Sequence, residues 1–170
     1  MQIQNKKTLS CLAVCLPFVV AYFIPVHANI FTYPLVHANV FHLVANMWAL
    51  YAFMKHADDK ETFVCFLIGG YIASLVSYWL YDGDYRVVVG ASGFIFGIIG
   101  IYLMLRYRGL KNIEMYKSRL FINVSILMAI GLIVPALAGL LHLYALAVGV
   151  LIGYLLVSIE RFMKNLQRYM

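Results

Sequence analysis

The sequence predicts an all-α polytopic membrane protein, in which six transmembrane helices form one bundle and both termini lie in the cytoplasm. Of the 170 residues, 64% are hydrophobic and only 12% are charged. Apolar blocks of about 20 residues, the length that crosses a bilayer core, alternate with short polar segments. Because such spans leave little chain for anything else, residues 1–170 are expected to form a single transmembrane domain. The spans are expected at residues 8–26, 38–55, 62–81, 87–105, 118–136 and 140–160.

The distribution of basic residues determines the expected topology. With the N-terminus in the cytoplasm, twelve of the thirteen Lys and Arg residues fall on the cytoplasmic side and Arg86 falls outside, which agrees with the positive-inside rule. This placement explains the net charge of +6 without a nucleic-acid partner. The first span could also be a signal peptide, since Lys6 and Lys7 precede its apolar core and residues 26–28 resemble a cleavage site. A retained helix is the preferred interpretation.

No metal or cofactor is predicted. The cysteines Cys11, Cys15 and Cys65 all lie within predicted spans, where they are expected to pack as small apolar side chains. The chain lacks an H-E-x-x-H motif, and His27 and His56 are expected near opposite faces of the membrane.

Polar side chains at membrane depth are costly, so each is a candidate functional residue. In the second span, His42 and Asn46 are four residues apart, so both point from one helix face, and Asn39 can join them. His37 is expected nearer the water. Considered alone, these residues are more simply explained as hydrogen-bonding groups that hold helices together.

The segment GASGFIFG, residues 90–97, contains a serine within an apolar span. Ser92 is expected about five residues, or roughly 8 Å, below the outer surface. In isolation, Gly90, Gly93 and Gly97 around this serine are more typical of a surface on which another helix packs.

The sixth span carries a complementary stripe of small residues. Ala145, Gly149 and Gly153 repeat every four residues and offer a surface on which the fourth span can lie. His142 lies at the outer end of the same stripe. If the two small-residue surfaces pack, His142 comes within contact distance of Ser92.

The second, fourth and sixth spans all enter from the outside in the expected topology, and their polar residues fall at one level. A histidine beside a serine can accept its hydroxyl proton and so activate it as a nucleophile. His42 and Asn46 could supply hydrogen bonds to the oxyanion that forms during attack on a carbonyl. The acidic residues all lie in loops or at helix ends. The economical hypothesis is therefore a dyad of Ser92 and His142.

With these residues in place, the chain resembles the rhomboid family of intramembrane serine proteases. The resemblance covers nearly the whole chain and rests on three motifs: His37-x4-His42-x3-Asn46, Gly90-x-Ser92-Gly93, and His142 followed by Ala145 and Gly149.

The resemblance implies a role for each residue of the motifs. Ser92 would be the nucleophile and His142 its general base, while the backbone amide of Ser92 and the side chains of His42 and Asn46 would form the oxyanion hole. The substrates would be transmembrane segments of other proteins in the lipid bilayer, cut near their outer ends. A prokaryotic cytoplasmic membrane, with the active site opening to the outer face, is the expected location.

Three positions depart from the family pattern. Phe96 stands where a tyrosine commonly packs against the catalytic histidine, and Ala145 stands where glycine is usual. The first outer loop, residues 27–37, is short and lacks the family's Trp-Arg pair. The short loop concerns substrate gating and lateral entry rather than the chemistry, whereas Phe96 should keep the stacking without the hydroxyl and Ala145 permits a slightly less close approach.

Two other functions remain open from the sequence. A non-catalytic rhomboid-like protein would bind or chaperone transmembrane segments, although such relatives typically lack the serine or the histidine. A small transporter would line a solute path with the polar cluster. The grouping of the polar residues near one face disfavours a transporter, because transporter sites usually lie near the midplane.

Overall fold

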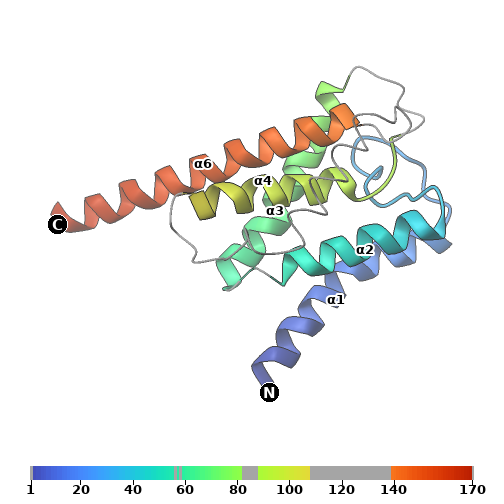
Figure 1. The fold of residues 1–170 in the computed structure, drawn as a ribbon, viewed down its shortest axis with the longest axis horizontal. Coiled ribbons are helices and arrows are strands. Elements are labelled where there is room, and N and C mark those ends of the chain that lie inside the picture. The colour runs from blue at the N-terminus through green and yellow to red at the C-terminus, as the bar shows by residue number, and fades with distance from the viewer. Residues whose placement is uncertain (1, 56, 58, 82–87, 108–138, 170) are drawn as a thin grey trace.

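The computed structural model describes residues 2–55, 57, 59–81, 88–107 and 139–169, and all regular secondary structure within these ranges is helical (Figure 1). The helices are α1 (Gln2–Phe23), α2 (Val40–Met54), α3 (Lys60–Leu80), α4 (Ser92–Tyr107) and α6 (Gly139–Tyr169).

Polar caps fix where α2 and α3 begin. The Asn39 side chain accepts a hydrogen bond from the backbone amide of His42 at 2.9 Å, and Asp59 accepts one from the amide of Thr62 at 2.6 Å. Each cap satisfies an amide that has no partner within its own helix. Asn39, which the sequence placed on one face with His42 and Asn46, therefore caps α2.

Helix α4 lies at the centre of the bundle, between α3 and α6 (Figure 1). Its residues from Gly93 to Tyr102 are all buried. Gly149 of α6 packs directly on the backbone of Gly97, so that a Cβ at Gly149 would overlap the Gly97 carbonyl. The missing Cβ of Gly97 itself faces α3, where Ala73 Cβ would be 2.6 Å away. The small residues of α6 thus bring two helix backbones into contact.

The surface of the bundle carries large apolar side chains. Leu16 of α1 is 60% exposed, Ile68 of α3 57% and Leu151 of α6 57%. Cys11 and Cys15 of α1 are instead buried in the core shared with α2 and α4, and Cys65 of α3 is half-buried. An apolar exterior of this kind suits a bilayer, where exposed hydrocarbon meets acyl chains.

Two of the described helices, Lys60–Leu80 and Gly139–Gln167, are long and apolar enough to cross a membrane when judged by length and composition. Helices α2 and α4 and the part of α1 from Lys7 to Phe23 are apolar but shorter. The count of six spans and the cytoplasmic position of both termini stay predictions.

The observed helix bounds differ from the expected spans in two informative places. Residues 88–91 of the expected span 87–105 form a turn, and α4 begins only at Ser92. Helix α6 continues nine residues beyond the expected end at 160, and its C-terminal part extends past the other described helices (Figure 1). The expected span 118–136 lies outside the described residues.

Candidate active site

Ser92 and His142 are hydrogen-bonded to each other. Ser92 is the first residue of α4, and His142 lies in the first turn of α6. The His142 Nε2 atom is 2.6 Å from the Ser92 Oγ atom. This contact follows from the packing of the two helices, because the close approach of Gly97 and Gly149 lies only one to two turns further along.

Phe96 fixes the plane of the His142 ring. It lies four residues after Ser92, on the same face of α4. Its ring stacks on the imidazole with the centroids 4.7 Å apart and the planes inclined by 28°. Ala145, one turn after His142, is fully buried. The stack leaves the Nε2 edge of His142 directed at the serine hydroxyl.

The turn before Ser92 requires glycine at position 90. Gly90 has φ +109°, a conformation that L-residues with side chains rarely adopt. A Cβ at this position would lie 2.5 Å from His42 Cε1 and 3.2 Å from Asn46 Nδ2. The side chains of His42 and Asn46 therefore converge on the backbone two residues before Ser92.

Asn46 carries an unsatisfied hydrogen-bond donor in this position. The residue is only 7% exposed, and its buried Nδ2 atom has no hydrogen-bond partner within the part of the chain that the structure describes. An unpaired buried amide typically costs about 1–3 kcal/mol. Asn46 Nδ2 lies beside the turn that carries Ser92. An unpaired donor in this place is suited to form its hydrogen bond only with a group that appears during a reaction.

His37 also reaches this turn, although the sequence placed it nearer the water. It is 7% exposed. Its Nδ1–H donates to the Leu35 carbonyl at 3.1 Å, which leaves Nε2 free to accept from the amide of Ala91 at 3.4 Å. Burial lowers the pKa of His37 to about 4, and the neighbouring His42, whose ring centroid is 5.2 Å away, also lowers it. His37 is thus a neutral acceptor that holds the residue before Ser92.

The short loop between α1 and α2 anchors the same turn. The amide of Gly90 donates to the carbonyl of Tyr33 at 3.0 Å. The Tyr33 hydroxyl donates to the Ser74 carbonyl of α3 at 2.8 Å, and its ring stacks on Tyr78 with the centroids 4.6 Å apart. Gly93 permits this arrangement, because a Cβ there would lie 2.8 Å from the Tyr33 hydroxyl oxygen. Sequence periodicity gave no signal for Tyr33.

The arrangement can support nucleophilic chemistry at Ser92. No carboxylate side chain contacts His142 among residues 2–55, 57, 59–81, 88–107 and 139–169. Ser92 also lies at the N-terminus of α4, where free backbone amides and the helix dipole favour negative charge. No group of three or more His, Cys, Asp or Glu side chains that could hold a metal ion occurs in these ranges.

Comparison with known proteins gives the same assignment as the motifs. Residues 27–159 match the family model of the rhomboid domain. The chain is 29% identical, over 72% of its length, to "Rhomboid-type serine protease 2" of Eremothecium gossypii, covering 50% of that protein. It is 30% identical, over 74% of its length, to "RHOMBOID-like protein 1" of Arabidopsis thaliana, covering 33% of that protein.

A bacterial relative, YdcA of Bacillus subtilis, is named provisionally as a rhomboid protease; it is 30% identical over 73% of the chain and 64% of its own length. The chain spans only part of each of these relatives. No solved structure matches the chain significantly. Since the rhomboid model covers most of the sequence, the chain belongs to the rhomboid family and is an integral membrane protein.

Proposed function

We propose that this protein is an intramembrane serine endopeptidase that cleaves transmembrane segments of other membrane proteins with a dyad of Ser92 and His142. The observation that carries the proposal is the 2.6 Å hydrogen bond between Ser92 Oγ and His142 Nε2. Serine is a weak nucleophile until a neighbouring base takes its proton. A contact of this length between two residues 50 positions apart in the sequence supports His142 as that base.

The proposed reaction has two stages, acylation of Ser92 and hydrolysis of the acyl-enzyme. The Ser92 proton passes to His142 Nε2 while Oγ bonds to the scissile carbonyl carbon. His142 then returns the proton to the departing amine as the peptide C–N bond breaks, which leaves an acyl-enzyme on Ser92. Water repeats the sequence with His142 as base, and the acyl group leaves as a carboxylate.

The oxyanion of each tetrahedral intermediate would be held by three donors. As the first residue of α4, Ser92 has a backbone amide without a partner in its own helix. The unpaired Nδ2 of Asn46 and the ring of His42 both lie against Gly90. Donors placed in advance at the developing charge usually lower the barrier more than any other single effect.

The substrate class follows from the position of the site in the bundle. Ser92 lies at the beginning of an apolar helix, and the polar residues around it lie at the same end of the bundle. A transmembrane helix shields its own carbonyls with internal hydrogen bonds, so it must unwind before it can be attacked. Segments with small or helix-breaking residues at that level are the expected substrates. A prokaryotic cytoplasmic membrane, with the site opening outward, is the proposed location.

The proposal is tested by labelling Ser92 with a fluorophosphonate in detergent, together with cleavage of a model transmembrane substrate in vesicles. The wild type is expected to be labelled and to cut the substrate. Ser92→Ala and His142→Ala should abolish both signals. Ser158→Ala and His27→Ala serve as matched controls, since both residues are exposed and neither has a role in the proposed reaction, and they should behave as wild type.

The alternative, a non-catalytic rhomboid-like protein that binds or chaperones transmembrane segments, makes the opposite prediction. Its wild type would resist labelling and leave every substrate intact, while still retaining transmembrane segments in a pull-down. Such a result would overturn the protease proposal.

A further inference from the structure

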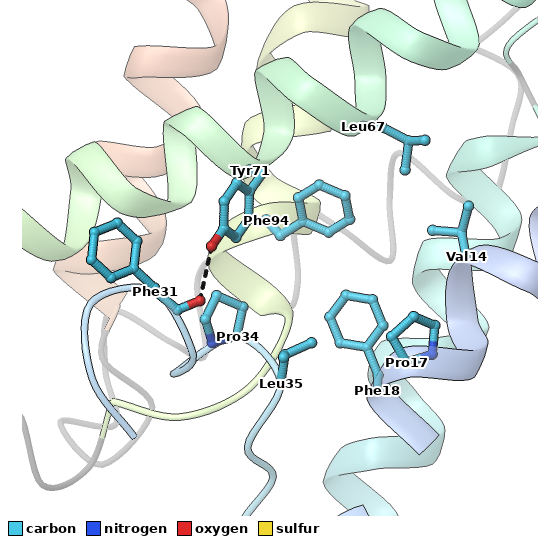
Figure 2. Close-up of a pocket in the computed structure, with 9 residues that line it drawn as sticks. All are labelled: Val14, Pro17, Phe18, Phe31, Pro34, Leu35, Leu67, Tyr71 and Phe94. Atoms are coloured by element: carbon cyan, nitrogen blue, oxygen red, sulfur yellow. Dashed lines mark hydrogen bonds between the residues drawn. The ribbon is translucent and has the colours of Figure 1, made fainter. Parts of the chain in front are cut away.

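An apolar pocket lies between α1, the loop before α2, α3 and the start of α4 (Figure 2). It has a volume of about 370 Å³. Side chains from all four elements line it, including Val14 and Phe18 of α1, Leu35 of the loop, Leu67 and Tyr71 of α3, and Phe94 of α4. The pocket is at the same level of the bundle as Ser92, which is two residues before Phe94.

The side chains that line the pocket leave no hydrogen-bond donor free for a ligand. Of the residues that line it, only Tyr71 has a polar side chain. Its hydroxyl already donates to the carbonyl of Phe31 at 2.9 Å, as the dashed line in Figure 2 shows. Water in such a space would lack the two to four polar partners that it needs. The lining therefore favours a hydrocarbon occupant over water.

The pocket continues the lipid-facing surface of the bundle. On α1, Leu16 and Val20 beside it are 60% and 45% exposed, and on α3, Ile68 and Ile72 are 57% and 45% exposed. In a membrane protein these side chains contact acyl chains. An empty pocket would forfeit dispersion contacts along its whole lining. Acyl chains are the hydrocarbon available at this surface.

One side chain of the pocket wall, Phe18, contacts both a second wall residue and His37. The Phe18 ring stacks on Phe94 with the centroids 6.1 Å apart and the planes inclined by 25°. The same ring meets His37 edge-on at 6.4 Å. His37 in turn accepts the hydrogen bond from the amide of Ala91. A shift of Phe18 would therefore displace His37, and through His37 the turn before Ser92.

We propose that an acyl chain of a membrane lipid occupies this pocket and, by supporting Phe18 and Phe94, holds His37 and Ala91 in the geometry that positions Ser92. The first half of the proposal is a binding site and is independent of catalysis. The second half, a dependence of Ser92 reactivity on lipid, rests on the proposed function.

Binding is tested with a phospholipid that carries a photoreactive diazirine in the middle of one acyl chain. The protein is reconstituted in vesicles that contain this lipid, irradiated and mapped by mass spectrometry. Labels are expected on Val14, Phe18 and Leu67 at several times the level found on Leu151, a lipid-facing residue outside the pocket. Equal labelling of the pocket and of Leu151 would overturn the binding site.

Matched variants separate the pocket from the surface beside it. Leu67→Trp fills the pocket, whereas Ile68→Trp adds the same side chain on the neighbouring exposed position. Leu67→Trp is expected to reduce pocket labelling at least fivefold, and Ile68→Trp to leave it unchanged. Val14→Phe fills the pocket from the opposite wall and takes the place of Leu67→Trp if that variant does not fold. Undiminished labelling in the folded pocket variant would contradict the site.

The coupling is tested by the rate at which a fluorophosphonate labels Ser92. In a bile-salt-type detergent without acyl chains, added phospholipid is expected to raise the rate at least threefold for the wild type and for Ile68→Trp. Leu67→Trp should show no lipid dependence. Equal acceleration of all three proteins would overturn the coupling. A complete lack of Ser92 labelling in every condition would refute the proposed function, while the diazirine result would still report on lipid binding.

Discussion

The imidazole of His142 lies against the ring of Phe96, with the two centroids 4.7 Å apart and the planes inclined by 28°. The ring of a neighbouring helix, and not a carboxylate, therefore orients the proposed general base in the described part of the chain. An aromatic pair of this kind is worth about 0.5–1.5 kcal/mol beyond its burial.

The first prediction concerns this stack. Phe96→Leu removes the ring but keeps an apolar side chain, so we expect kcat for a transmembrane substrate to fall about two- to tenfold. Phe96→Tyr keeps the ring and should stay within about twofold of wild type. The measurement is the initial cleavage rate in vesicles over a range of substrate densities. Equal rates for Phe96→Leu and wild type would show that the stack does not orient His142.

The second prediction concerns Gly90. Gly90→Ala introduces a Cβ 2.5 Å from His42 Cε1 and forces alanine into a left-handed conformation. Displacement of the oxyanion donors should lower kcat at least about a hundredfold. Gly69→Ala is the matched control, because its Cβ would meet the tip of the Ile101 side chain at 2.6 Å, which can rotate away. The control should keep activity within about threefold.

The difference in kcat between Gly90→Ala and Gly69→Ala would disappear if the turn were not rigid. A Gly90→Ala protein that cleaves as well as Gly69→Ala would mean that His42 and Asn46 do not need to lie against this backbone.

The third prediction separates function from stability at Asn46. Its Nδ2 donor is buried and unpaired among the described residues, so Asn46→Leu removes a group that destabilises the resting protein. We expect kcat to fall about a hundred- to a thousandfold with little change in KM, and the thermal unfolding midpoint to stay level or rise. Asn165→Leu, at an exposed site on α6, controls for the substitution. If both the thermal unfolding midpoint and kcat of Asn46→Leu fell, Asn46 would have a structural role.

The fourth prediction concerns pH. Burial lowers the pKa of His37 from 6.5 to about 4, so the unfolded chain binds a proton at a higher pH than the folded protein does. The contribution of neutral His37 to stability is therefore complete above pH 6.5 and declines as the pH falls toward 4. His37→Gln retains an acceptor for the Ala91 amide but cannot titrate.

We accordingly expect the unfolding midpoint of wild type to fall relative to that of His37→Gln between pH 6.5 and 4, and the two to run parallel above pH 7. Thermal unfolding in one detergent across this range measures the difference. His42, the nearest titratable neighbour, is retained in both proteins. Parallel curves throughout would show that the buried ring does not titrate with folding.

The pairing of Ser92 with His142 was accessible from the sequence, because close helix contact requires small residues and these recur every four residues in α6. Family membership was accessible as well, since the three motifs coincide with the matched rhomboid domain. The start of α4 was not accessible. Hydropathy treats residues 88–91 as apolar chain and contains no information on the positive φ of Gly90.

The contacts of His37 and Tyr33 with the turn before Ser92 could not be predicted from the sequence, for a different reason. Both act through contacts between a loop and a distant turn; His37 and Ala91 are 54 positions apart in the sequence. Helical periodicity relates only residues within one helix, so it placed His37 away from the site. The spacing of His37 and His42 in the motif indicated that His37 could belong to the site. It did not indicate which way the His37 side chain points.

The distribution of the dyad over α4 and α6 also bears on the biosynthesis of the protein. Ser92 leaves the ribosome 50 residues before His142, so a nascent chain carries the serine without its proposed base. The hydrogen bond between them forms only after α6 has been inserted and Gly149 has packed on Gly97. The proposed protease would therefore be inert during its own membrane insertion, when other unfinished membrane proteins lie close to it.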